Sequence, residues 1–299
     1  MAFICIDIGG TNTLLGIGNG DFEIKKEMKT KKFLSNIKPN IKQVIEDSRH
    51  EENDFSQVLV AAGGPVDVEE GVFYPPNLEN KEMKEVDIND KLEPFGEVEL
   101  INDCNSAVLG EYVYGEHKTE NLIYVTISSG IGAGLILDGN LVEGFNGNIG
   151  EIGHMELGNQ VKCGCGQKGH WEAYSSGNGM PKMAKTLYNL DFENSLEIFR
   201  EYEKDSPDAK KVIEKMHEMN RKGFENLVNL YNPEKIVLGG AVALNHQKTI
   251  IEPLKNRLEG KTVNDTPEIS KCSLGEEAVI HGLRAIANQE KPVPNRLKK

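Results

Sequence analysis

The stretch Phe3-Ile-Cys-Ile-Asp-Ile8 leads directly into Gly9-Gly10-Thr11, and the chain becomes apolar again at Leu14-Leu-Gly-Ile17. An apolar run, a glycine turn and a second apolar run form the pattern of a β-hairpin. The pattern recurs further along, where Leu122-Ile-Tyr-Val-Thr-Ile127 is followed by the glycine-rich turn Ser128-Ser-Gly-Ile-Gly-Ala-Gly134 and more apolar residues. The sequence therefore predicts two halves built on one plan.

Between and after these hairpins, apolar residues recur three or four positions apart, which is the pattern of amphipathic helices. The pattern predicts helices over 37–49, 105–115, 209–231 and 276–288, and short apolar runs predict buried strands over 58–62 and 98–101. Because strands alternate with helices, we expect an α/β fold. The polar stretch 115–121 places a domain boundary near residue 117.

The composition excludes several classes of protein. The 299 residues carry a net charge of −13, and their basic clusters are short, which disfavours a broad nucleic-acid surface. The apolar runs are too short for a membrane span of ~20 residues. Asp7 interrupts the first apolar run, which argues against a signal peptide. Five cysteines, an odd number, disfavour a disulfide framework. We expect a cytoplasmic protein with no nucleic-acid or membrane partner.

Glycine turns that follow strands present backbone N–H groups without side-chain bulk, which suits a bound polyphosphate. One such turn alone would be an ordinary hairpin, but Gly9-Gly10-Thr11 and 130–134 occur together. Asp7 stands two residues before Gly9, so its carboxylate is a candidate ligand for Mg²⁺.

Asn102 and Asp103 follow an apolar strand and open a predicted helix. One interpretation is that they cap the helix, because Asn and Asp favour that position. The other is a carboxylate that points from a strand end into a cleft and is kept ionised by the helix N-terminus. Such a carboxylate accepts a proton late, as a hydroxyl oxygen commits to phosphorus.

Two imidazoles and two thiolates lie within a short glycine-rich segment, at His154, Cys163, Cys165 and His170. These ligands match the tetrahedral nitrogen and sulfur preference of structural zinc. The alternative is two buried thiols beside surface histidines.

Glu151 and Glu172 flank the same segment, and with His154 and Asn102 they form a polar set that suits a ligand with several hydroxyls, such as a sugar. The alternative for each glutamate is a solvated surface position.

Taken together, these motifs resemble the ROK family of sugar kinases, within the actin-like, hexokinase-like ATPase superfamily. The strings that carry the resemblance cover most of the chain: Asp7-Ile-Gly-Gly-Thr11, Gly64-Pro-Val-Asp67, Pro76-Asn-Leu78, Asn102-Asp-Cys-Asn-Ser-Ala107 with Gly110-Glu111, Ser129-Gly-Ile-Gly-Ala-Gly134, Gly144-Phe-Asn-Gly147, Gly150-Glu-Ile-Gly-His154, Cys163-Gly-Cys165-Gly-Gln-Lys-Gly-His-Trp-Glu172 and Leu238-Gly-Gly240.

The resemblance implies two actin-like (RNase H-like) α/β domains around a central cleft. The first would span 1–117, with the C-terminal helix 276–299 packed back on it. The second would span 118–275 and contain a zinc knuckle over 154–172. The implied activity is ATP-dependent phosphorylation of a hexose at its 6-hydroxyl. We expect glucose as the acceptor, with fructose, mannose, N-acetylmannosamine and N-acetylglucosamine as alternatives, and a homodimer as the assembly.

Site residues follow from the same resemblance. Asp103 would be the catalytic base, and the zinc would order the knuckle. The residues near the sugar would be Gly64, Asn77, Asn102, Asp103, Glu151, His154 and Glu172. The residues that hold ATP and Mg²⁺ would be Asp7, Gly9, Gly10, Thr11, Asn12, Ser129, Gly130, Gly132, Gly134, Gly239 and Gly240.

Two departures from the family pattern affect these expectations. The family usually has a third cysteine where this chain has His170, so we expect a neutral Cys2His2 zinc site. An aromatic residue commonly follows the Pro-Asn-Leu segment, and residues 79–83 supply none. That segment lies near the sugar in the family, so the identity of the sugar is left open.

Two other classes of function remain for comparison. The family includes sugar-responsive repressors with an N-terminal DNA-binding segment, for which a phosphate loop beginning at Asp7 leaves no room. A catalytically silent sugar-binding protein is the other class. An intact Asp103 and two phosphate loops argue against it.

Overall fold

The computed structural model describes residues 2–74, 85–290 and 292. The chain divides into two compact units. Unit 1 contains Met1–Lys118, Gly134–Ile149 and Glu277–Lys299, and unit 2 contains Thr119–Ala133 and Gly150–Glu276.

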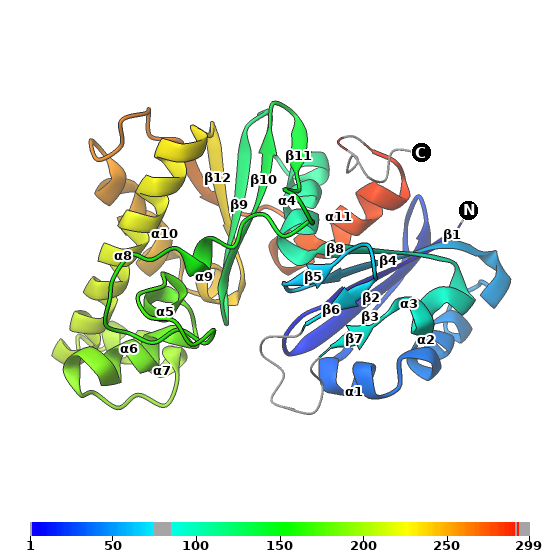
Figure 1. Ribbon diagram of the computed structural model, residues 1–299, viewed down its shortest axis with the longest axis horizontal. Coiled ribbons are helices and arrows are strands. Elements are labelled where there is room, and N and C mark those ends of the chain that lie inside the picture. Colours follow the sequence, from blue (N-terminus) through cyan, green and yellow to red (C-terminus); the bar gives the residue numbers. More distant parts are fainter. Residues whose placement is uncertain (1, 75–84, 291, 293–299) are drawn as a thin grey trace. The chain divides into compact units, whose positions relative to one another are not determined.

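A five-stranded sheet organises unit 1 (Figure 1). Its order is β3 (Asp21–Lys29), β2 (Asn12–Asn19), β1 (Ala2–Ile8), β4 (Phe55–Ala62) and β8 (Glu97–Asn102). Strands β1 and β2 are antiparallel, which confirms the first predicted hairpin. Strands β1, β4 and β8 are parallel neighbours, so their carboxyl ends lie at one edge of the sheet.

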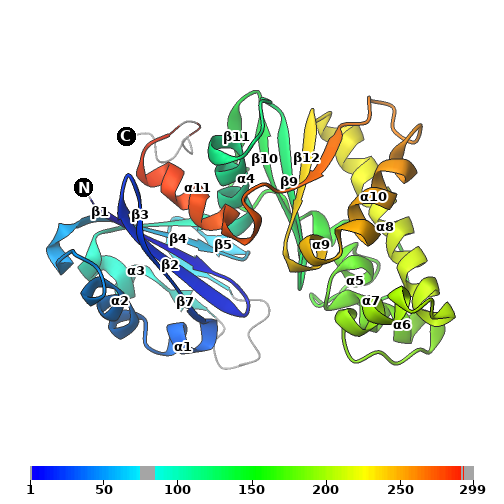
Figure 2. The same cartoon turned by 180° about the vertical axis from the view of Figure 1, so that it is seen from behind.

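Both faces of this sheet are covered, which explains why β1 is apolar almost throughout. Ile4, Ile6 and Ile8 belong to a core with residues of α1 (Thr30–Ser35) and α2 (Ile37–Glu46). On the other face α11 (Ala278–Ala287) contacts β1 and β4 and packs against α4 (Asp103–Tyr114), as Figures 1 and 2 show. Unit 1 also contains short elements: η1 (Glu52–Asp54), β5 (Val66–Asp67), β6 (Val72–Phe73), β7 (Val86–Asp87), α3 (Asn89–Leu92) and η2 (Glu93–Phe95).

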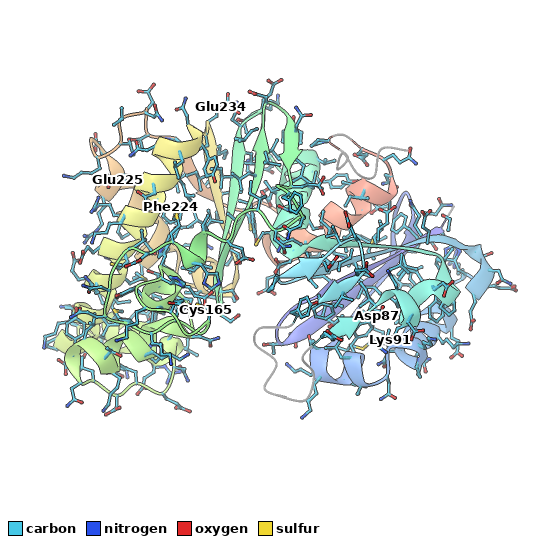
Figure 3. The ribbon with its side chains drawn as sticks, in the orientation of Figure 1. Asp87, Lys91, Cys165, Phe224, Glu225 and Glu234 are labelled. Carbon is cyan, nitrogen blue, oxygen red and sulfur yellow. The ribbon has the colours of Figure 1, made fainter. Side chains whose placement is uncertain are left out.

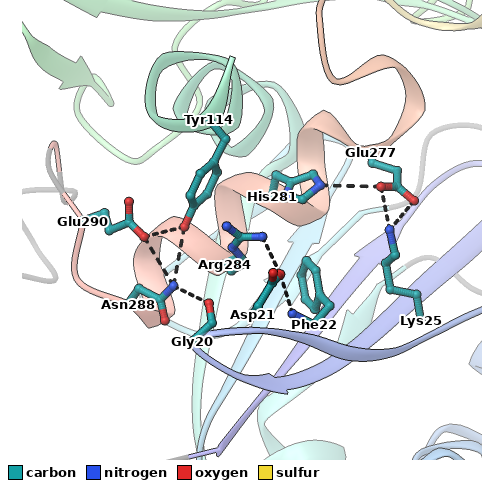
Figure 4. A network of polar contacts seen from close by, with 10 residues as sticks. All are labelled: Gly20, Asp21, Phe22, Lys25, Tyr114, Glu277, His281, Arg284, Asn288 and Glu290. Atoms are coloured by element: carbon teal, nitrogen blue, oxygen red, sulfur yellow. Dashed lines mark hydrogen bonds and ion pairs between the residues drawn. The ribbon is translucent and has the colours of Figure 1, made fainter. Parts of the chain in front are cut away.

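Polar contacts fasten α11 to the β2–β3 turn and to α4 (Figure 4). Arg284 donates to Asp21 over 2.7 Å, and its guanidinium lies 4.0 Å from the ring centroid of Tyr114. Asn288 donates to the carbonyl of Gly20 over 2.8 Å. Helix α11 is therefore joined to unit 1 by specific contacts as well as by apolar packing.

A second five-stranded sheet has the order β11 (Asn140–Val142), β10 (Ile131–Leu137), β9 (Leu122–Ile127), β12 (Lys235–Gly239) and β13 (Glu268–Lys271). The neighbouring positions of β9 and β10 agree with the second predicted hairpin. The expected domain boundary differs from the structure in one respect, because Gly134–Ile149 groups with unit 1. Gly134 packs directly on the backbone of Cys104 in α4, and β11 contacts α4 as well.

The helices of unit 2 are α5 (Glu172–Ser175), α6 (Gly179–Tyr188), α7 (Ser195–Glu203), α8 (Pro207–Tyr231), α9 (Ala241–Asn245) and α10 (Gln247–Leu258), with η3 (Ile152–His154) and η4 (Gly275–Glu277) as short turns. The predicted helix 209–231 is confirmed as α8, which Ser206 caps and Pro207 opens. Buried Trp171 packs edge-on against Phe224 of α8 and donates to Asn220 over 2.9 Å. Phe224 is labelled in Figure 3. In the described part of the chain, no helix is long and apolar enough to cross a membrane.

Candidate functional site

Two carboxylates meet at the carboxyl edge of the first sheet. Asp7 lies near the end of β1, and Asp103 directly follows β8 as the first residue of α4. Burial, and then the charge of Asp103, raise the pKa of Asp7 to about 8. A side-chain carbon built on Gly63, just after β4, would lie 3.6 Å from Asp103 Oδ2. The carboxyl ends of the parallel strands β1, β4 and β8 therefore lie together at one acidic site.

Asn102 caps α4, as the first interpretation expects. Its Oδ1 accepts from the backbone N–H groups of Cys104 at 2.9 Å and Asn105 at 3.3 Å. This fixes the helix start and leaves the amide Nδ2 to donate to a ligand. Asp103 Oδ1 also accepts from Cys104 N–H, at 2.8 Å. The cap and the strand-end carboxylate are thus both present, on adjacent residues.

The surroundings of Asp103 raise the pKa of its carboxyl above the ordinary value of 3.8. Burial raises the pKa of Asp103 and outweighs the backbone donors at the start of α4. A carboxylate with a raised pKa is a stronger proton acceptor, which suits a general base.

The first glycine turn is closed by its own neighbours. Gly9 N–H donates to Asn12 O over 3.0 Å, and Thr30 Oγ1 donates to Gly9 O over 2.6 Å. A side-chain carbon on Gly10 would meet nothing within 4 Å, so the backbone there is open to a ligand. Thr11 and Asn12 are exposed, and Asn12 Oδ1 accepts from Lys29 over 2.8 Å.

The second glycine turn, 128–131, lies at the ends of β9 and β12, which pair in parallel through Thr126 and Gly239. Ser129 is exposed, while Gly130 and Gly132 are half-buried. Gly240 has a φ of +83° and opens α9.

Two of the glycines expected to contact ATP, Gly134 and Gly239, are buried. Gly134 lies against the Cys104 carbonyl, and a side chain on Gly239 would meet the ring of Tyr124. The structure gives both glycines a packing role, because each allows a close approach that a side chain would block.

His154, Cys163, Cys165 and His170 place one ligand atom each within 4.8 Å of one another. The two Nδ1 atoms are 3.1 Å apart, Cys163 Sγ is 3.9 Å from His154 Nδ1, and Cys165 Sγ is 3.3 Å from His170 Nδ1. Zinc bond lengths around a tetrahedron give N–N separations of about 3.3 Å and N–S separations of about 3.6 Å. The donor set therefore fits zinc, and His170 supplies one of its four ligand atoms.

The cluster is built on tight loops. Trp171 N–H donates to Met155 O, and Cys163 N–H donates to Gln167 O. Cys163 is buried, and Cys165 lies exposed on the knuckle loop, labelled in Figure 3. Burial raises the pKa of the Cys163 thiol to about 11, so metal binding at neutral pH would displace its proton.

The expected sugar ligands of unit 2 gather around this cluster. His154 turns Nδ1 to the cluster, and its Nε2 lies 3.7 Å from Glu151 Oε2. Glu172 Oε1 lies 3.5 Å from Cys163 Sγ. In unit 1, Gly64 adjoins the Gly63 position near Asp103. Asn77 lies outside the described residues.

Two features were not predicted from the sequence. Asn148 clamps Val66, donating to its carbonyl and accepting from its N–H over 2.7 and 2.8 Å, and so holds the segment after Gly64. Glu172 Oε2 accepts from Ile131 N–H in the second glycine turn over 3.1 Å. Neither pair had a local signal, because the partners are 82 and 41 residues apart.

Comparison with known proteins decides the family. The ROK family model matches residues 3–290. This chain belongs to the ROK family. A relative named glucokinase from Pyrobaculum calidifontis is 32% identical over 82% of each chain. A ROK hexokinase structure from Thermus thermophilus is 25% identical, with a TM-score of 0.79 over 97% of this chain and 99% of that one. The xylose repressor of Bacillus subtilis is 26% identical over 76% of this ROK chain and 59% of its own length.

Proposed function

We propose that this protein is an ATP-dependent hexose kinase that transfers the γ-phosphoryl group directly to the 6-hydroxyl of its acceptor. We take glucose as the acceptor, because the ROK relative that is 32% identical to this chain is named glucokinase. Direct transfer requires one base, a pair of phosphate loops and no covalent nucleophile.

The observation that carries the proposal is the position of Asp103. It opens α4 at the carboxyl edge of three parallel strands, beside Asp7, and burial raises its pKa. A base held by its backbone and by the capped helix is fixed before substrate arrives. It would accept the hydroxyl proton as the oxygen–phosphorus bond forms, and the ADP oxygen leaves on the opposite side.

The other proposed site residues would bind either the sugar or ATP. Asn102 Nδ2, Glu151, His154 and Glu172 would hold sugar hydroxyls, and the turns at 9–12 and 128–132 would hold phosphates. Asp7 would hold Mg²⁺, which offsets phosphate charge when bound. Structural zinc on the four-residue cluster would stabilise the knuckle and take no part in the chemical step.

The test is ADP release from Mg-ATP with a panel of hexoses and N-acetylhexosamines, comparing wild type with Asp103→Asn. We expect sugar-dependent turnover in wild type and a loss of roughly 10²–10⁴-fold in the variant, with sugar affinity near normal. Asp90→Asn, an exposed carboxylate of α3, is the matched control and should turn over normally.

The panel also separates the rival functions. Binding of ATP and sugar without ADP formation would contradict the proposal and favour a silent sugar-binding protein. Near-normal turnover in Asp103→Asn would contradict its role as base. Turnover with an N-acetylhexosamine alone would keep the kinase and replace glucose as its acceptor.

A further inference from the structure

Glu172, the first residue of α5, has a carboxylate with two different neighbours. Oε2 accepts from Ile131 N–H over 3.1 Å, and Oε1 faces Cys163 Sγ at 3.5 Å. We infer that Glu172 is a positioning residue that holds the Gly130–Ile131 turn in the conformation that receives the nucleotide phosphates. The nucleotide part of this inference rests on the proposed function, but the contact with the turn does not.

The glycine at position 130 supports this role. Its φ lies outside the left-handed range, so the backbone conformation does not require glycine there. A side-chain carbon on Gly130 would instead lie 2.5 Å from Glu172 Oε2. The carboxylate therefore occupies the space that any other side chain would fill. The absence of a side chain at Gly130 therefore makes room for the carboxylate of Glu172, although the two residues are far apart in the sequence.

Two backbone bonds show that the segment around α5 supports the whole turn. Gly177 N–H donates to Ser128 O over 2.7 Å, and Asn178 N–H donates to Ser129 O over 3.3 Å. Of these three anchors, only the bond to Ile131 comes from a side chain. A substitution at Glu172 leaves the backbone anchors in place, so it tests the turn without removing all of its support.

A positioning role and a sugar-binding role predict different results when no sugar is present. A residue that only binds sugar would leave the free turn unchanged when it is removed. A residue that holds Ile131 N–H would loosen the turn in every state of the protein. Hydrogen bonds to charged groups contribute enough free energy for the loss of one to change local opening by tenfold or more.

The experiment measures amide exchange of 128–134 and affinity for a non-hydrolysable ATP analogue, in zinc-loaded and sugar-free protein. We expect Glu172→Ala to speed exchange at Ile131 at least tenfold and to weaken nucleotide binding by about tenfold. Glu172→Gln should restore both to within about threefold, because its amide oxygen still accepts from Ile131. In turnover, the alanine variant should raise the KM for ATP more than it lowers kcat.

Two further variants complete the design. Gly130→Ala displaces the carboxylate but keeps all four cluster residues, so it should loosen the turn with zinc content unchanged. Glu151→Ala removes the other carboxylate near His154 and should leave exchange at 128–134 as in wild type.

Wild-type exchange in both Glu172→Ala and Gly130→Ala would overturn the inference, and so would equal loosening in Glu172→Ala and Glu172→Gln. If wild type bound no nucleotide, the kinase proposal and the nucleotide part of the inference would fail together. The exchange data would then still decide whether Glu172 holds the turn.

Discussion

The two glycine turns follow similar strands but are held in different ways. The turn at Gly9–Asn12 is closed by its own backbone and by Thr30, within the first 30 residues. The turn at 128–131 has a backbone bond of its own, from Ser128 N–H to Gly130 O, and it is also held by Glu172 and by the backbone of Gly177 and Asn178. Similar local patterns thus have different support: the residues that hold the first turn lie within the first 30 residues, whereas the second turn also depends on a distant segment beside the His–Cys cluster.

Metal removal should have the largest effect of the changes considered, and it should affect the second turn but not the first. If the His–Cys cluster holds zinc, as proposed, then stripping it with a chelator, or replacing Cys163 with Ser, would remove a cross-link between the loops before α5. We expect the Tm to fall by more than ~5 °C and amide exchange to rise at 128–134, but not at 9–12.

Calorimetry and exchange mass spectrometry measure these effects, with Cys272→Ser as the control cysteine outside the cluster. Equal loosening of both turns, or none in either, would contradict the difference in support. Absence of stoichiometric zinc from protein purified without chelator would contradict the zinc assignment itself.

The pH dependence of stability tests the region of the first turn, through Asp7, which lies two residues before Gly9. The folded-state pKa of Asp7 is about 8, against an ordinary value of 3.8, so the folded protein retains a proton that the unfolded chain releases. This contribution to stability is present at low pH and is lost as pH rises from about 4 to 8.

Asp7→Asn removes that titration. Without divalent cations, the free energy of unfolding of the variant, relative to that of wild type, should therefore increase by about 1–3 kcal/mol as the pH rises from about 4 to 8. The figure is below the full linkage value because Asp7 is only partly buried by surface area. Urea titrations at pH 5 and pH 8 measure the difference, and Asp90→Asn should show none. A difference that stays constant with pH would contradict the raised pKa.

Features that residues close in sequence determine could be predicted, and features that depend on distant residues could not. The first hairpin, the helix α8 and the His–Cys cluster were predictable, because residues close in sequence carry their patterns. The cap at Asn102 was foreseen, but the raised pKa of Asp103 was not, since burial depends on elements far along the chain. The packing role of Gly134 required knowing that α4 lies against it.

The smallest predicted effect tests whether the first turn is locally supported. Thr30 Oγ1 donates to Gly9 O and contacts Thr13 Oγ1 at 3.1 Å, and both threonines are buried. Thr30→Val keeps the shape but leaves the Gly9 carbonyl and the Thr13 hydroxyl without this partner, which costs about 1–2 kcal/mol of stability.

Because the turn is also closed by Gly9 N–H to Asn12 O, it should loosen without opening, and the KM for ATP should rise only a few-fold. Denaturant titration and exchange at 9–12 measure this change, while 128–134 should stay as in wild type. Thr262→Val removes a comparable bond to Asn264 O in unit 2 and is the matched control. If Thr30→Val loosened the second turn as much as the first, the two turns would not be held independently. That result would contradict the conclusion that different residues support them.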